Sequence, residues 1–250
     1  MRAIAASLFS RTHRQGAAPD PAFFYWLAGR LVRWCAVAAT ALMAAGLAAG
    51  LVVAPPAVGQ GDAARILFVH VPATWLSLGL YVAMALCAAL TLGPHAGVPP
   101  VLMMALAPTG AMFTLLALWT GSLLGQAVWV RFWDARVTCE LILLVLYASV
   151  LALRSLIANR TRADRACAVL ALIGVLNLPI VYFSLSWWDT LHRAAAARLI
   201  GTTAGRPPGA MLLIASAFAL YACAVVLARA RCLMRERALE RKPTSRKGAA

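Results

Sequence analysis

A short aromatic and charged segment, W-V-R-F-W-D-A-R-V-T-C-E over Trp129–Glu140, lies between two long apolar runs. The runs cover Val101–Leu124 and Val137–Ile157, and each has about the 20 residues that a membrane-spanning helix needs. Tryptophan in such a place can simply anchor helix ends among lipid headgroups. The segment is of chemical interest because two other connections each bring a histidine to the same side of the expected membrane.

The first of these histidines is His70, in R-I-L-F-V-H-V-P-A, and the second is His192, in S-W-W-D-T-L-H-R. Pro72 suits the first turn of a helix, where its missing N–H costs nothing, so we expect His70 at the outer mouth of the next helix. Two neutral imidazoles can bind haem iron from opposite sides, aromatic rings can cover the flat macrocycle, and arginines can pair with propionates. An aromatic belt with two interfacial histidines is the alternative interpretation.

Three charged side chains surround the start of the apolar run at Val137. Asp134 and Arg136 flank the expected helix start, where the helix dipole favours an acid. Glu140 follows one turn later at the edge of the apolar core, where a carboxylate requires a partner. Arg136 is four residues away on the same helix and is the expected partner. The pair could fix the connection structurally, hold it rigid for a ligand, or do both.

Composition assigns the chain to the integral membrane proteins. It has 250 residues, of which 63% are hydrophobic and 12% charged, with a mean hydropathy of +0.81, whereas soluble domains average about 25% charged residues. Apolar runs of spanning length are expected to be helical, which predicts an all-α bundle of six transmembrane helices in one domain over residues 1–250. Residues 1–30 and 229–250 would flank the bundle. The runs are Leu31–Val53, Val71–Leu92, Val101–Leu124, Val137–Ile157, Ala166–Leu185 and Gly209–Ala228. Pro108 and Pro179 lie inside two of them and should kink their helices.

The distribution of charge predicts the orientation. The net charge is +15, but the basic residues cluster at the termini and in the connection after Ile157, which is typical of cytoplasmic segments. Anionic membrane lipid explains the basic tail, and no nucleic-acid partner is expected. No G-x-x-x-x-G-K-[ST] phosphate loop is present, so the chain has no ATPase of its own. All but six of the 23 lysines and arginines fall on the inner side; the six are Arg65, Arg131, Arg136, Arg193, Arg198 and Arg206.

Four segments resemble the cytochrome c biogenesis haem-handling family CcmC, which belongs to a superfamily named for a tryptophan-rich outer loop. The resemblance extends from the first expected helix to the last. In this sequence the aromatic loop reads W-V-R-F-W-D, whereas the family's loop usually reads W-G-x-x-W-x-W-D and is richer in tryptophan. The four segments are R-I-L-F-V-H-V-P-A-T-W, G-S-L-L-G-Q-A-V-W, W-D-A-R-V-T-C-E-L and N-L-P-I-V-Y-F-S-L-S-W-W-D-T-L-H.

The resemblance implies a haem-presenting protein of the bacterial inner membrane, not an enzyme. Haem b would be held on the periplasmic face and passed to a membrane-anchored haem chaperone. Implied partners are the ATPase and membrane subunits of an ABC transporter and a small single-span subunit. His70 and His192 would be the iron ligands. The other implied haem-binding residues are Trp129, Phe132, Trp133, Asp134, Arg136, Trp187 and Trp188.

Two other functions remain open from the sequence. A haem lyase of the same superfamily would attach haem to apocytochrome, but such chains are longer and carry additional intramembrane histidines. A b-type electron-transfer protein would hold haem between helices near the middle of the membrane, whereas His70 and His192 are expected at helix mouths.

Overall fold

Helices account for all the regular structure that is described. The computed structural model describes residues 21–53, 65–93, 97–124, 135–187 and 208–240, leaving aside the side chains of residues 51–53, 124, 135, 184–187 and 208. Six helices are long and apolar enough to cross a membrane, which confirms the six-helix prediction. The candidate spans are Pro21–Gly50, Leu67–Leu92, Pro99–Leu123, Arg136–Leu156, Arg160–Phe183 and Gly209–Glu240.

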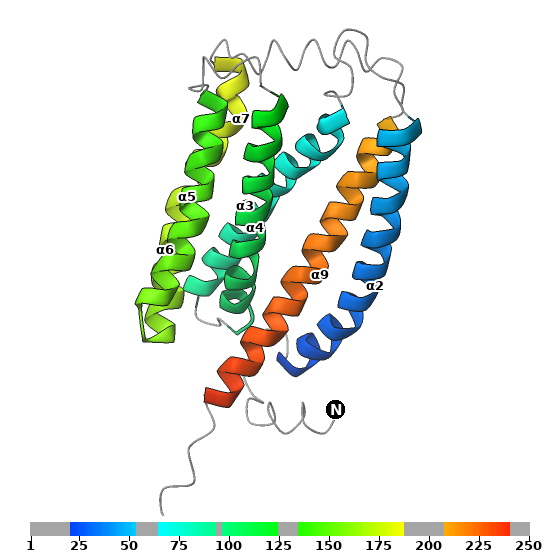
Figure 1. Cartoon of the computed structure of the whole chain (residues 1–250). Helices are drawn as coiled ribbons and strands as arrows, with labels where there is room; N and C mark the ends of the chain where they lie inside the picture. Colours follow the sequence, from blue (N-terminus) through cyan, green and yellow to red (C-terminus); the bar gives the residue numbers. More distant parts are fainter. Residues whose placement is uncertain (1–20, 54–64, 94–96, 125–134, 188–207, 241–250) are drawn as a thin grey trace, which may run out of the picture.

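The helices run up and down between the two ends of the bundle, and α3 slants across α4 (Figure 1). The hydrophobic runs become helices because every backbone N–H and C=O must be satisfied within its own segment where water is absent. The elements in chain order are α2 (Pro21–Leu47), the π-helix η1 (Ala48–Val53), α3 (Leu67–Leu92), α4 (Pro99–Leu124), α5 (Ala135–Leu156), α6 (Arg160–Gly174), α7 (Asn177–Trp187) and α9 (Pro208–Glu240).

The first and last helices extend furthest beyond their apolar runs. The first begins at Pro21 and not at Leu31, so the aromatic residues that precede the run are helical. The last continues beyond Ala228 to Glu240, so the first part of the expected basic tail is helical as well. Arginine and glutamate are good helix formers, and contacts with α6 hold this extension against the bundle.

The two prolines expected to disturb helices differ in effect. Near Pro179 the fifth span is divided into α6 and α7, with a turn at residues 175–176. Pro179 has no N–H to donate to the carbonyl of Val175, which explains a break at this point. In contrast, α4 runs through Pro108 as one helix.

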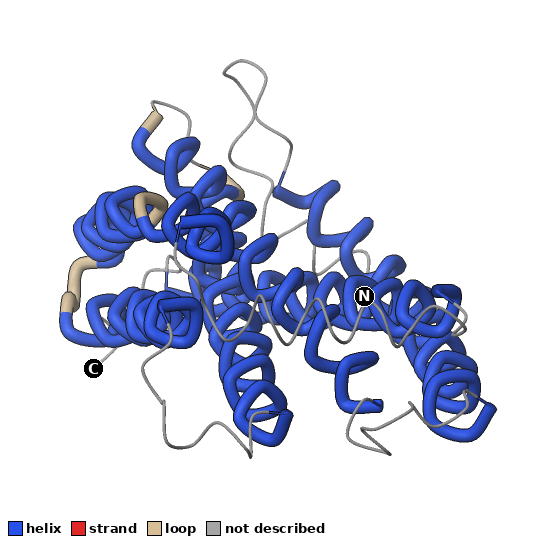
Figure 2. Tube along the Cα trace, turned by 90° about the horizontal axis from the view of Figure 1, so that it is seen from above, coloured by secondary structure: helices blue, strands red, loops and turns tan. Residues whose placement is uncertain are grey.

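The core is formed where α3, α4, α5 and α6 meet. Tyr81 of α3 and Tyr147 of α5 are fully buried, and their rings pack edge to face with centroids 5.1 Å apart. Gly110 of α4 faces Tyr147 so closely that a Cβ atom there would overlap the phenol ring. Helix α2 packs chiefly against α9, and Figure 2 shows the helices from above.

Candidate functional site

Four helix termini gather at one end of the bundle (Figure 1). Helix α3 begins there at Leu67, α4 ends at Leu124, α5 begins at Ala135 and α7 ends at Trp187. The chain segments that carry the predicted aromatic loop and the second histidine are therefore attached at the end where His70 lies. The convergence of these residues on one face stays a prediction, because the residues themselves lie outside the described part of the chain.

The imidazole of His70 lies against helix α4. Its Nδ1 atom is 3.1 Å from the backbone carbonyl oxygen of Ala117 and 3.1 Å from the hydroxyl oxygen of Thr120. A carbonyl oxygen can only accept a hydrogen bond, so Nδ1 must be the donor. In the neutral imidazole this tautomer places the lone pair on Nε2, the nitrogen that would then ligate a metal.

Thr120 is suited to accept this hydrogen bond. Its hydroxyl hydrogen points back along the helix to the carbonyl of Leu116, at 2.7 Å, which leaves the hydroxyl oxygen available as an acceptor. Gly121 provides space beside the imidazole, because a Cβ atom at position 121 would lie 3.0 Å from Cε1 of His70. Two acceptors on α4 thus orient the imidazole, and Gly121 lies next to it.

The local structure corrects two expectations about this segment. His70 is the fourth residue of α3 and does not precede the helix, and Pro72 lies in the helix interior and not in the first turn. Pro72 cannot donate a hydrogen bond to the carbonyl of Phe68, and both Phe68 and Pro72 are buried. His70 remains within one turn of the helix start, as expected for a residue at the helix mouth.

Glu140 has a different partner from the one expected. The residue is only 4% exposed, and its carboxylate accepts a hydrogen bond of 2.6 Å from the hydroxyl of Ser77 on α3. Arg136 instead donates to the backbone carbonyl of Val181 on α7, at 3.2 Å. Because the guanidinium extends to another helix, Arg136 ties α5 to α7, and Ser77 ties α5 to α3.

Most of the predicted haem-contacting residues lie outside the described part of the chain, so their roles stay predictions. Helix α7 ends at Trp187, whose side chain is not described. Thr120, Gly121 and Ser77 were missed by the sequence analysis. Pairing α3 and α4 as an antiparallel hairpin could have identified Thr120 and Gly121, because both lie near the end of α4 that faces His70. The residues outside the described ranges are His192, Trp129, Phe132, Trp133, Asp134 and Trp188.

The described geometry suits one axial ligand of a haem iron. Neutral imidazole is a common haem ligand, and metal-bound histidines usually donate their other N–H to a carbonyl or carboxylate, which fixes the ring and raises its basicity. His70 has this arrangement through Ala117 and Thr120. The chain's own residues therefore fit the requirement for a fixed imidazole at the end of the bundle.

Comparisons with known proteins all point to one family. Residues 15–245 match the family model described as Heme exporter protein C. The chain is 41% identical over 177 residues to Heme exporter protein C of Escherichia coli strain K12, covering 70% of this chain and 72% of the relative. It is 41% identical over 184 residues to the protein of that name from Bradyrhizobium diazoefficiens, covering 73% and 70%. A putative cytochrome c biosynthesis ccmC-like mitochondrial protein of Marchantia polymorpha is 38% identical over 153 residues, covering 60% and 64%.

Proposed function

The chain belongs to the Heme exporter protein C family, and we propose that it holds haem b at one face of the membrane for delivery to a haem chaperone in cytochrome c biogenesis. The observation that carries this proposal is the hydrogen bond from Nδ1 of His70 to the carbonyl of Ala117. It selects the tautomer whose Nε2 can ligate iron. Haem is the cargo of this site, and no covalent bond in it needs to be broken.

The second ligand and the haem platform complete the proposal. His192 would bind the iron from the opposite side, and Trp129, Phe132 and Trp133 would lie against the macrocycle. Two imidazole ligands give low-spin iron, and flat aromatic side chains can pack on the ring with favourable dispersion. Attachment of their segments at the His70 end of the bundle supports this arrangement. Arg136 would hold α5 and α7 at a fixed separation beneath the haem.

The orientation and partners also belong to this proposal. The concentration of basic residues at the end of the bundle opposite His70 favours a periplasmic haem face and cytoplasmic termini in a bacterial inner membrane. The chain would work with the ATPase and membrane subunits of an ABC transporter and with a small single-span subunit. Hydrolysis of ATP in that transporter would release the haem-loaded chaperone.

A haem-binding experiment tests the proposal. The purified protein should show a low-spin haem spectrum, which His70→Ala and His192→Ala should each abolish or convert to a high-spin spectrum. His95→Ala serves as the matched control, because His95 follows in sequence after α3, which ends at Leu92 at the other end of the bundle. Capture of haem by the chaperone should fall with the first two variants and not with the control. Identical spectra and capture for all three variants would refute the ligand assignment.

A further inference from the structure

A groove lies at the end of the bundle opposite His70. It is formed between α4, α5 and α9 and has a volume of about 470 Å³, which is within the range of small-molecule sites of about 300–1,000 Å³. All three helices are candidate membrane spans by length and composition, so bilayer lipid is an expected neighbour of the groove. Its chemistry is divided between an apolar floor and a basic rim.

The apolar floor lies deeper along the helices. Met104 comes from α4, Leu151 from α5 and Ala228 from α9. None of these side chains can hydrogen-bond to a soluble anion, whereas they can contact a hydrocarbon chain. A ligand that fills the whole groove therefore needs an apolar part.

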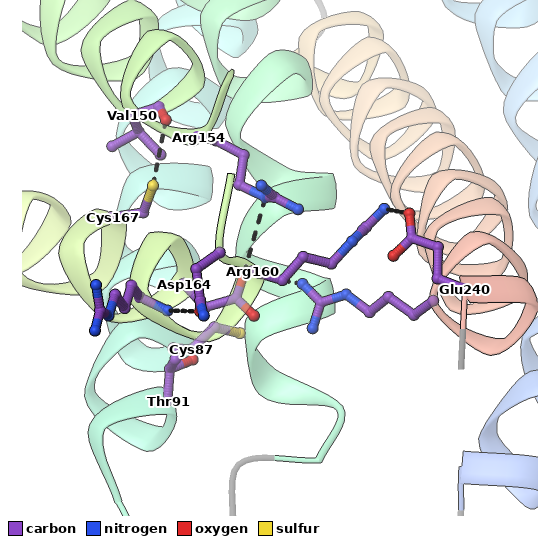
Figure 3. Close-up of polar contacts among 11 residues, drawn as sticks. Cys87, Thr91, Val150, Arg154, Arg160, Asp164, Cys167 and Glu240 are labelled. Carbon is purple, nitrogen blue, oxygen red and sulfur yellow. Dashed lines mark hydrogen bonds and ion pairs between the residues drawn. The ribbon is translucent and has the colours of Figure 1, made fainter. Parts of the chain in front are cut away.

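The basic rim contains Arg154, Arg229 and Arg237. Arg237 donates to the carboxylate of Asp164 at 2.9 Å, and Arg154 reaches the same oxygen at 4.0 Å. Figure 3 shows Asp164 beside Arg154, in a cluster that joins the ends of α5, α6 and α9. One carboxylate is thus shared between two guanidinium groups, which leaves the rim short of negative charge.

The remaining charges favour a ligand with one negative charge. The acid among the residues that line the groove is Glu236, which is exposed, whereas Asp164 contacts two of the rim arginines without lining the groove itself. The three arginines therefore face two carboxylates, and the rim keeps one net positive charge. In addition, Nε of Arg237 is buried without a hydrogen-bond partner among the described residues, so a buried donor remains unsatisfied beside the groove.

We propose that this groove binds one anionic phospholipid of the surrounding bilayer. Its phosphate diester would lie among the three arginines, and one acyl chain would extend over Met104, Leu151 and Ala228. A phosphate diester has one negative charge and several acceptor oxygens, which matches the rim, and its hydrocarbon matches the floor. Basic pockets between membrane helices are known to bind anionic headgroups. The bound lipid would connect α9 to α4 and α5 at the end of the bundle distant from His70.

Native mass spectrometry of the detergent-purified full chain tests this proposal with phosphatidylglycerol as the probe. The parent should retain one phosphatidylglycerol and bind it more tightly than phosphatidylcholine, whose headgroup has no net charge. Arg229→Gln removes a rim charge that forms no ion pair among the described residues, and should weaken binding about five-fold. Ala228→Phe fills the floor and should also weaken it. Arg235→Gln is the matched control, because Arg235 is exposed on the same helix and does not line the groove.

Each other outcome would overturn the assignment. If Arg235→Gln weakens binding as much as Arg229→Gln, phosphatidylglycerol binds a diffuse basic surface and not the groove. Equal binding of phosphatidylglycerol and phosphatidylcholine by the parent would show that the charge of the rim does not select the lipid. Displacement of the lipid by haemin, with haemin binding lost in Arg229→Gln, would make the groove a haem site. The helical circular dichroism of each variant shows whether it is folded, and Arg229→Gln tests the site if Ala228→Phe fails to fold.

Discussion

The hydroxyl of Ser77 on α3 donates a hydrogen bond of 2.6 Å to the buried carboxylate of Glu140 on α5. The phenol of Tyr147, also on α5, donates to the backbone carbonyl of the same serine at 2.9 Å. Two side chains of α5 therefore hold one residue of α3. Ser77 lies two turns along α3 from His70, so this contact fixes the helix that carries the imidazole.

The contact between Ser77 and Glu140 predicts a measurable loss of stability. Ser77→Ala removes the hydroxyl and leaves a buried carboxylate oxygen without its donor, which should lower the free energy of unfolding by about 1–3 kcal/mol. Ser155→Ala is the control, because Ser155 is exposed and bonds only to its own helix; it should change stability by about 0.5 kcal/mol or less. Reversible unfolding in mixed micelles measures both, and equal effects would contradict the contact.

Thr120 should affect haem retention through His70. Thr120→Val removes one of the two acceptors at Nδ1 but keeps the side-chain shape, so haem affinity should fall about ten-fold, the lower limit for such outer-shell changes. Thr114→Val is the matched control, because Thr114 is on the same helix and its hydroxyl donates to the carbonyl of Gly110 in that helix. Haem titration followed by absorbance gives the two affinities. Equal affinities for these variants would show that Thr120 does not orient the ligand.

Gly121 should be required for the space next to the imidazole. Gly121→Val places branched carbon atoms where a Cβ alone would already lie 3.0 Å from His70, so the ring must move and the low-spin spectrum should weaken or disappear. Gly79→Val is the matched control, since nothing lies within 4 Å of a Cβ at Gly79. Both changes replace a helical glycine by the same residue. A normal spectrum for Gly121→Val would show that the imidazole tolerates crowding.

The aromatic loop predicts a graded effect on capture. Trp129→Ala and Trp133→Ala should each weaken haem or chaperone capture by about 1–3 kcal/mol, because each removes one aromatic contact. Phe132→Trp brings the loop closer to the tryptophan-rich pattern and should maintain or strengthen capture. The yield of haem-loaded chaperone, normalised to the protein level in the membrane, measures this. Unchanged yields for both alanine variants would reduce the loop to an interfacial anchor.

The orientation predicts the accessibility of four positions. Single cysteines in a cysteine-free background should react from the cytoplasmic side at Gly97 and Asn159 and from the periplasmic side at Gln126 and Gly201. The basic residues near the termini and near Asn159 are the physical reason, because positive charge is retained in the cytoplasm during insertion. Labelling of intact cells with an impermeant thiol reagent distinguishes the two sides. Cytoplasmic labelling of Gln126 would exclude haem presentation at the periplasmic face.

The sequence by itself determined the helical class and the number of spans. Hydropathy is a sum over neighbouring residues, and a segment in lipid must satisfy its own backbone, so long apolar runs suffice to mark helices. The sequence predicted a disturbance at both Pro108 and Pro179, because each lacks an N–H, but it did not predict that only the helix near Pro179 is divided. Helix ends were less predictable. The extension of α9 to Glu240 brings Arg237 into contact with Asp164 on another helix, and a contact between two helices is not specified by local sequence.

Only the tertiary structure decided which side chains face one another. Sequence spacing placed Arg136 one turn from Glu140, but the rotation of α5 in the bundle directs Glu140 towards Ser77 and Arg136 towards α7. The acceptors at His70 likewise come from Ala117 and Thr120 on a different helix. Such contacts depend on the rotation and depth of two packed helices, which no local pattern of hydropathy or charge specifies.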